Sequence, residues 1–290
     1  MITALLTPGP VQTVALGTAL LGALAGALGT FSTLRRQSLM GDVLSHAALP
    51  GICLGYLAAG SRSLPWLLAG ALLAGLLAAA SVQLVLRMTR LKADAVMGVV
   101  LSGFFALGTV LLSAIQHSGA GGHAGLSTFL FGQAAAMLQS DVRLIGGAAA
   151  AVALVLALVW KDLKLVTFDR DYARSLGRPV TGIEALLSAA TAVAIVLGLQ
   201  VVGVVLMVAL LIAPAVAARQ WVQSLFPMLV LAALAGAVSG VAGALVSSGA
   251  RGLATGPVIA LIAAGLAGVS LLLAPGRGLL VRGFLKGARG

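Results

Sequence analysis

The sequence predicts an all-α protein: a polytopic bundle of about eight to ten transmembrane helices forming one domain over residues 1–290. Of the 290 residues, 60% are hydrophobic and 9% are charged, whereas soluble domains are about 25% charged. The mean hydropathy is +1.13, and the apolar residues gather in runs near the roughly 20 residues that a membrane-spanning helix needs. These observations exclude an ordinary soluble domain.

Nine apolar runs are long enough to be candidate spans. They cover residues 11–34, 42–59, 64–86, 94–115, 142–160, 183–199, 201–218, 225–248 and 256–274. The stretch 183–218 is divided because a single helix of that length would rise about 54 Å, against a hydrocarbon core of about 30 Å. We expect the break at Gln200 and Gly203. Segment 128–140 is too short to span and predicts a half-helix or an interfacial helix.

The positions of the basic residues predict the orientation of the chain. Positive charge in short loops marks the cytoplasmic side of a membrane protein. With the N-terminus outside, 15 of the 18 Lys and Arg fall in inner loops or in the C-terminal tail. We therefore expect an external N-terminus and a cytoplasmic C-terminus. The first ten residues carry no Lys or Arg, which argues against an ordinary cleavable signal peptide.

The net charge of +11 would suit a nucleic-acid partner, but the charges lie between apolar runs. This is the membrane pattern, so lipid and not nucleic acid is expected around the chain. Cys53 is the only cysteine and excludes an intramolecular disulfide framework. Pairs of glycines four residues apart (22/26, 51/55 and 236/240) predict a tightly packed bundle, because small residues let helices approach closely in lipid.

Asp42 and His46 are the strongest candidates for a functional site. Residues four apart share one helix face, and an ionisable residue at membrane depth is costly and is interpreted as functional by default. A carboxylate and an imidazole together suit a divalent transition metal. Alternatively, Asp42 and Ser45 cap a helix at the cytoplasmic surface and His46 points into neighbouring protein. Glu184 and Asp94, by contrast, each begin a helix and are expected only to complement its positive end.

Two prolines are expected to break or gate helices. A proline inside a helix cannot donate to the carbonyl four residues earlier and its ring crowds that carbonyl. Pro50 would free the carbonyl of His46, which could then join Asp42 and His46 around an ion. Pro214 would do the same for Leu210 and produce a bend.

Segment 161–182 is the longest polar interruption and carries three of the seven acids and five basic residues. Asp169 and Asp171 are typical of a helix start, and Gly177 followed by Pro179 is typical of its end. The mixed charge and the aromatic residues Phe168 and Tyr172 favour a short helix that docks into a partner. The alternative is a solvated linker.

Three blocks of this sequence resemble the membrane subunits of bacterial ATP-binding-cassette importers for manganese, zinc and iron. These are MGDVLSHAALPG at 40–51, FDRDYARSLG at 168–177, and LQVVG at 199–203 followed by ALLIAPA at 209–215, with FLFG at 129–132 as a weaker fourth. The resemblance covers about residues 30–220. The outer loop 116–128 and the tail match least well.

The resemblance implies a multi-pass protein of the bacterial cell (inner) membrane. It implies a permease dimer bound to two cytoplasmic ATP-binding subunits and supplied by an external metal-binding protein. Asp42 and His46 would line the path of the ion. The second block would be the coupling helix, with its contacts among Phe168, Asp169, Tyr172, Ala173, Leu176 and Gly177. The sequence has no GxxxxGK[ST] motif, so ATP hydrolysis would belong to a separate chain and this subunit would not be an enzyme.

Several points stay open at the level of sequence. His117 and His123 could capture metal outside the membrane or be ordinary loop histidines. An ion-coupled secondary carrier would need several buried acids, and a permease for a metal chelate or cofactor would want a wide, apolar path. No covalently bound cofactor is expected, and the transported ion could be manganese, zinc or iron. Because one chain offers two side-chain ligands, we expect a two-fold dimer in which both pairs face the axis near mid-membrane.

Overall fold

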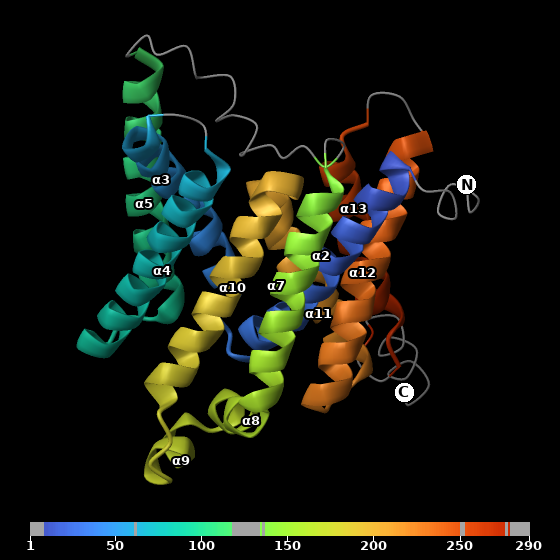
Figure 1. Ribbon diagram of the computed structural model, residues 1–290. Coiled ribbons are helices and arrows are strands. Elements are labelled where there is room, and N and C mark those ends of the chain that lie inside the picture. The colour runs from blue at the N-terminus through green and yellow to red at the C-terminus, as the bar shows by residue number, and fades with distance from the viewer. Residues whose placement is uncertain are drawn as a thin grey trace. The chain divides into compact units, whose positions relative to one another are not determined.

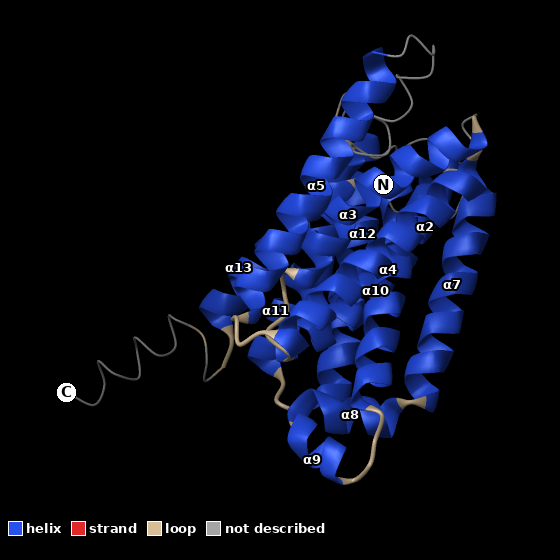
Figure 2. Cartoon of the chain, turned by 90° about the vertical axis from the view of Figure 1, so that its left-hand side faces the viewer, coloured by secondary structure: helices blue, strands red, loops and turns tan. Residues whose placement is uncertain are grey.

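The computed structural model describes residues 9–60, 63–117, 134, 137–249, 253–275 and 278. Within these residues the chain is helical and contains no strand (Figure 2). Figure 1 shows the helices, whose bounds follow: α2 (Pro10–Leu34), α3 (Met40–Ala59), α4 (Leu64–Met88), α5 (Ala93–His117), α7 (Gln139–Leu158), α8 (Trp160–Phe168), α9 (Arg170–Ser175), α10 (Val180–Val202), α11 (Val204–Trp221), α12 (Leu225–Gly249) and α13 (Thr255–Leu273).

Eight of these helices are long and apolar enough to cross a membrane, and α11 is a shorter apolar helix. Each of the nine predicted spans corresponds to one helix, which confirms an all-α polytopic bundle. The predicted break in the long apolar run is confirmed at Gly203 and wrong at Gln200, which lies within α10. Gly203 separates α10 from α11 with φ +84°, a backbone conformation that favours glycine. Of the predicted short helix at 128–140, only the last residues are described as helix, and they begin α7.

The chain divides into two compact units. Unit 1 contains residues 1–34, 134–149 and 209–290, and unit 2 contains residues 35–133 and 150–208. Two of the boundaries, at 149/150 and 208/209, fall inside α7 and α11. One transmembrane domain over residues 1–290 therefore stays a prediction. All of the described residues that we assign below to ion binding and to coupling belong to unit 2.

In unit 1, α2 packs against α12 through residues without large side chains. A Cβ added to Gly22 would clash with the carbonyl oxygen of Gly236, and one added to Gly26 would clash with that of Ala232. The Thr18 hydroxyl donates to the Gly240 carbonyl at 3.1 Å. The predicted close approach of helices at glycine pairs is thus confirmed here.

In unit 2, α3 is enclosed by α4, α5 and α10. The backbones of α3 and α4 are in direct contact. A Cβ added to Gly51 would clash with the Gly70 carbonyl, and one added to Gly55 would clash with the Trp66 carbonyl. On the α5 side, a Cβ on Gly108 would lie 2.8 Å from Cδ of Pro50. These contacts fix the rotation of α3 and so determine which of its residues stay accessible.

The expected helix break at Pro50 is wrong, and α11 does not end at Pro214, where the expected bend stays a prediction. α3 continues through Pro50 and α11 continues through Pro214. A proline costs a helix one backbone hydrogen bond, but packing on both sides of the residue can hold the helical path. For α3 that packing includes Gly108, which leaves room for the Pro50 ring. A role of either proline in gating stays a prediction.

Candidate ion-binding and coupling sites

Asp42 and His46 lie together on one face of α3, as their spacing predicts. Nε2 of His46 is 3.2 Å from Oδ1 of Asp42, and the two side chains are 27% and 32% exposed, respectively. Their neighbours Val43 and Ala47 are fully buried. The pair therefore occupies the accessible stripe of a helix whose other faces are packed. The Asp42–His46 pair is neither fully buried inside unit 2 nor without a polar contact.

α5 supplies the contacts that orient this stripe. The rings of His46 and Phe105 meet edge to face with centroids 4.9 Å apart. One turn further along α5, Gly108 admits Pro50, and its carbonyl accepts a weak hydrogen bond from Sγ of Cys53 at 3.9 Å. Sequence reasoning missed Phe105 and Gly108, because an apolar residue in an apolar helix gives no signal of its partner.

The pair offers an ion two side-chain ligands from one chain. Among the described residues no group of three or more His, Cys, Asp and Glu comes close enough to hold a metal ion. A carboxylate oxygen and an imidazole nitrogen suit first-row divalent ions, but two ligands do not complete the four of a closed site. The arrangement can bind an ion weakly unless further ligands come from elsewhere.

The pair does not lie halfway along its helix. Asp42 and His46 are the third and seventh residues of the twenty in α3. His46 is thus only about 9 Å along the axis from Met40, the first residue. The expected place of the pair near mid-membrane and beside a dimer axis stays a prediction. The pair lies nearer the end at which Arg35 and Met40 lie.

His117 lies apart from this pair. It ends α5, where Nδ1 is 2.8 Å from the Ser113 carbonyl oxygen, and it borders an open groove with Thr109 and Val110. Twelve residues of helix separate it from Phe105, which is about 18 Å of rise. His123 and the weaker block at 129–132 lie outside the described residues. Metal capture by these histidines stays a prediction.

The predicted helix in segment 161–182 is present as α9, preceded by α8. Oδ1 of Asp169 accepts a hydrogen bond from the Tyr172 amide at 2.9 Å and caps the helix. At the other end Gly177 adopts φ +71°. There the Arg178 amide donates to the Ala173 carbonyl at 3.0 Å and the Gly177 amide to the Arg174 carbonyl at 2.9 Å. This pair of bonds is the Schellman ending that glycine permits.

The surface of α9 has a buried side and an apolar exposed side. Ala173 is fully buried, whereas Phe168, Tyr172 and Leu176 are 60%, 54% and 53% exposed. Tyr172 lies on α9 and Leu176 follows it by four residues at the C-cap, whereas Phe168 ends α8 before the extended Asp169. Exposed large apolar side chains on a short polar segment are typical of a protein-binding surface.

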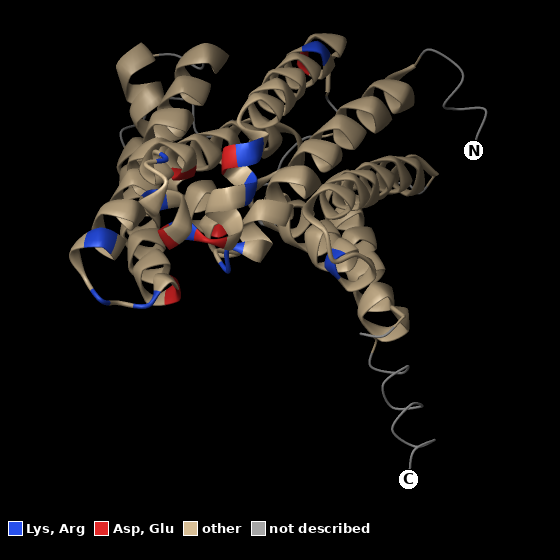
Figure 3. Ribbon diagram, turned by 90° about the horizontal axis from the view of Figure 1, so that it is seen from below, with Lys and Arg blue, Asp and Glu red and all other residues tan. Residues whose placement is uncertain are grey.

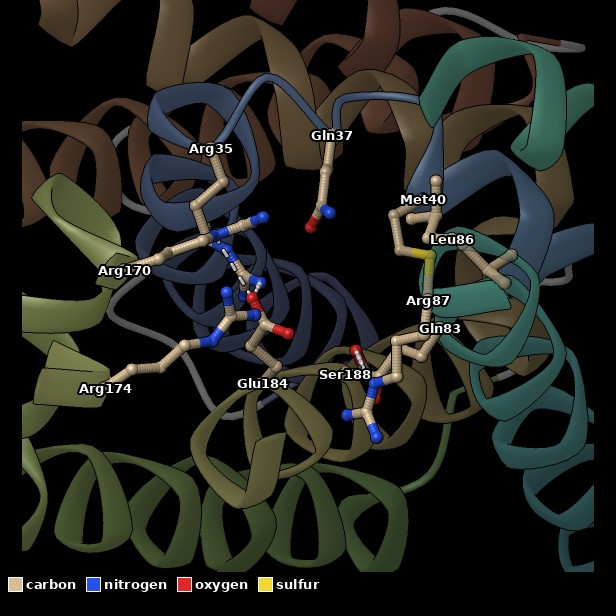
Figure 4. Close-up of a pocket in the computed structure, with 11 residues that line it drawn as sticks. Arg35, Gln37, Met40, Gln83, Leu86, Arg87, Arg170, Arg174, Glu184 and Ser188 are labelled. Carbon is tan, nitrogen blue, oxygen red and sulfur yellow. Dashed lines mark hydrogen bonds and ion pairs between the residues drawn. The ribbon is translucent and has the colours of Figure 1, made fainter. Parts of the chain in front are cut away.

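A buried ion-pair network lies within unit 2, where this segment meets α10 and the connection before α3, and sequence reasoning missed it. Oε1 of Glu184 on α10 is 2.6 Å from Nη2 of Arg35 and 3.2 Å from Nε of Arg170 (Figure 4). The Arg35 and Glu184 side chains are only 6% and 14% exposed. The expectation that Glu184 only complements the positive end of a helix is wrong, because its carboxylate also pairs with two arginines. The one available signal was that it is the only glutamate in the chain.

The network borders a small pocket with a surplus of positive charge. Its volume is about 110 Å³, and Arg87 and Arg174 line it together with the three residues of the network (Figure 4). Figure 3, viewed toward the end of unit 2 that carries α8 and α9, shows acidic and basic residues adjoining one another. Arg35, Arg87 and Arg170 come from three different loops that the positions of the basic residues assign to the inner side. They border one pocket, in agreement with the prediction that these loops share a side.

Burial has an electrostatic consequence for Arg35. Removal of its guanidinium from water lowers the pKa of Arg35, and the neighbouring Glu184 carboxylate opposes that change. Arg170 acts in the same direction as burial, because it is a second positive charge. Arginine nevertheless stays protonated in proteins. Glu184 is therefore the group that makes a buried positive charge tolerable at this position.

Comparison with known proteins identifies the family of this chain. Residues 10–274 match the family described as "ABC 3 transport family". The "Manganese transport system membrane protein MntC" of Bacillus subtilis is 47% identical over 271 residues, which are 93% of this chain and 62% of that protein's length. The "Zinc transport system membrane protein TroC" of Treponema pallidum is 48% identical over 269 residues, 93% of this chain and 90% of that protein.

A solved structure, "PsaBC from Streptococcus pneumoniae in complex with Fab", superposes with a TM-score of 0.82 at 32% sequence identity. The superposition covers 99% of this chain and 98% of that chain. The family match spans most of the sequence and includes both the α3 pair and the α9 segment. This chain belongs to the ABC 3 transport family.

Proposed function

We propose that this chain is the membrane permease subunit of an ATP-driven importer of divalent transition-metal ions: manganese, zinc or iron. The observation that carries the proposal is the Asp42–His46 pair on the accessible face of α3, in a chain whose relatives are named as manganese and zinc transport proteins. The protein would lie in the bacterial cell membrane, with its N-terminus outside and its C-terminus in the cytoplasm.

The incompleteness of the pair supports a dimer. Two ligands from each of two chains would give four, which is the number in a closed zinc site, and two-fold dimers are the commonest oligomers. Asp42 and His46 would then face each other across the axis. Ligands divided between two subunits suit a conduit, because separation of the helices weakens the site and releases the ion.

The exposed apolar side chains of Phe168, Tyr172 and Leu176 support docking to a separate ATP-binding subunit. The capped and Gly177-terminated α9 presents these side chains in a fixed arrangement, and large apolar anchors carry much of the affinity at protein interfaces. Asp169 holds the start of α9, and Ala173 packs its inner side. An external metal-binding protein would deliver the ion.

Uptake measurements test the importer. The permease, its ATP-binding subunit and the external binding protein would be reconstituted in liposomes and supplied with Mn²⁺, Zn²⁺ or Fe²⁺. We expect ATP-dependent accumulation of at least one ion. Accumulation that needs an ion gradient and not ATP would show a secondary carrier and overturn the proposal.

Docking is tested separately with Gly177→Glu. Residues other than glycine are strained at positive φ, so this change should distort the end of α9 and separate or uncouple the subunits. Gly177→Asn is the matched control at the same site, because asparagine tolerates the positive φ that ends α9. If the Gly177 variant still co-purifies with the ATP-binding subunit and keeps stimulated hydrolysis, the segment is only a linker.

A further inference from the structure

The Glu184 network joins three segments that are distant in the sequence. Arg35 lies on the short connection that leads into α3, Arg170 is the first residue of α9, and Glu184 lies near the start of α10. One carboxylate oxygen, Oε1, contacts both guanidinium groups. The start of the segment proposed to bind the ATP-binding subunit is thus tied to the entrance of the helix that carries Asp42 and His46.

The burial of this network makes the connection stiff. Arg35 is 6% exposed and 149 residues from Glu184 in sequence. Leaving a buried charge without its partner is strongly unfavourable. A movement of α9 that displaced Arg170 would pull on the shared carboxylate, and Arg35 would have to follow or lose its counter-charge. Arg35 is seven residues before Asp42, and Met40 at the start of α3 lines the same pocket.

We propose that Glu184 is a positioning residue that transmits movement of α9, through Arg35, to the start of α3 and hence to the Asp42–His46 pair. This inference rests on the proposed function, because it needs ATP hydrolysis on a subunit bound at α9. It assigns the transmission to one carboxylate and two guanidinium groups. If movement reached α3 only through apolar contacts between α10 and α3, these three side chains would have no special part in it.

The pocket beside the network leaves room for a second arrangement. Nε of Arg35 is buried and has no hydrogen-bond partner among the described residues. Gln37, Gln83 and Ser188, whose side chains carry oxygen atoms, line the same pocket, and Gln83 donates to the Ser188 hydroxyl at 3.3 Å (Figure 4). A shift of Arg35 toward these oxygens would satisfy Nε. A second arrangement of this kind is what a transmitting element would require.

Arg170→Gln is the sharpest test. Arg170 is 41% exposed, so its loss leaves the buried Arg35–Glu184 pair intact and the protein should still fold, with a small loss of stability. Replacement of Glu184, by contrast, endangers folding. The complex of permease and ATP-binding subunit would be reconstituted in liposomes with Mn²⁺ and, in parallel, with Zn²⁺. The measured quantity is the number of ions taken up for each ATP hydrolysed.

We expect Arg170→Gln to co-purify with the ATP-binding subunit and to hydrolyse ATP, while ions transported for each ATP fall about tenfold, within the usual range of coupling effects. Arg170→Lys, which keeps a cation opposite Glu184, should restore most of the ratio. Asp162→Asn breaks the ion pair with Arg178 in the same segment (3.3 Å). It does not touch Glu184, so the ratio should stay unchanged.

A fall of less than about threefold in the Arg170→Gln ratio, or an equal fall in Asp162→Asn, would overturn the inference. Loss of co-purification in Arg170→Gln would also overturn it, because Arg170 would then act in docking. The proposed function fails by a different result. It fails if ion accumulation by the unaltered complex needs an ion gradient and not ATP, whatever Arg170→Gln does.

Discussion

The Asp42–His46 pair and the Glu184 network are built on opposite physical principles, although both lie in unit 2. The pair consists of two side chains from one helix, about a third exposed, with a single contact of 3.2 Å between them. The network joins three segments, and its two central groups are 6% and 14% exposed. One is accessible and under-ligated, and the other is buried and supplied with a counter-charge.

This difference corresponds to what each region has to do. A transport site has to release the ion that it binds, so sparse ligation is an advantage. A connection between moving segments has to keep its contacts while those segments move. Burial helps, because the protein interior screens charge less than water does and so strengthens electrostatic attraction. The predictions below test whether the two regions separate in this way, beginning with the largest expected effect.

Removal of either member of the pair should abolish transport. Asp42→Ala or His46→Ala should reduce ion uptake to the background of protein-free liposomes, because one remaining ligand from each chain cannot hold a dehydrated ion. Expression and association with the ATP-binding subunit should be unchanged. Ser45→Ala is the matched control on the same helix, since its hydroxyl donates only to its own backbone at Gly41. Normal uptake in both pair variants would show that the path lies elsewhere.

Removal of the central carboxylate should act on folding as well as on transport. Glu184→Ala leaves Arg35 buried without a counter-charge, which typically costs about 3–5 kcal/mol of stability. Thermal unfolding of the purified permease in detergent would measure the loss. Asp94→Asn is the control, because Asp94 also lies at a helix start but is exposed. Equal stability of the two variants would contradict the contrast between a buried link and a surface charge.

The sequence predicted those features that depend on local spacing. The four-residue interval of Asp42 and His46, the glycine that divides α10 from α11, and the start and end of α9 are all patterns within a few residues. The glycine pairs likewise predicted close helix contacts, and Gly22 and Gly51 make them.

Features that depend on contacts between distant segments were not predictable. Glu184 and Arg35 are 149 residues apart, so nothing in the neighbourhood of Glu184 distinguished it from Asp94. The error at Pro50 has a related cause. The rule for proline concerns one helix alone, and continuity of α3 past Pro50 depends on its neighbours, including Gly108 of α5. The shared face of Asp42 and His46 could be predicted from the sequence, but the contact with Phe105 that orients His46 could not.

A smaller effect should follow from changing the surface on which α3 is held. Gly51→Ala would place a methyl group against the Gly70 carbonyl and 2.7 Å from Cβ of Ala74. Overpacking of this kind costs about 1–3 kcal/mol, and uptake should fall because the rotation of α3 sets the direction of the pair. Gly98→Ala, with open space around its Cβ, should change neither unfolding temperature nor uptake. Equal behaviour of the two would mean that the α3–α4 contact does not position the site.

The smallest effect should come from an exposed ion pair on α9, one turn from Arg170. Nη1 of Arg174 lies 3.2 Å from Oδ1 of Asp171, but these side chains are 65% and 93% exposed. Exposed pairs contribute at most about 0.5–1 kcal/mol, because water and salt screen the charges. Arg174→Gln should therefore leave the unfolding temperature nearly unchanged at any salt concentration. Arg170→Gln should lower it measurably, since its partner Glu184 is 14% exposed. If the two variants lose the same stability, burial of the carboxylate does not distinguish the network from an ordinary surface pair.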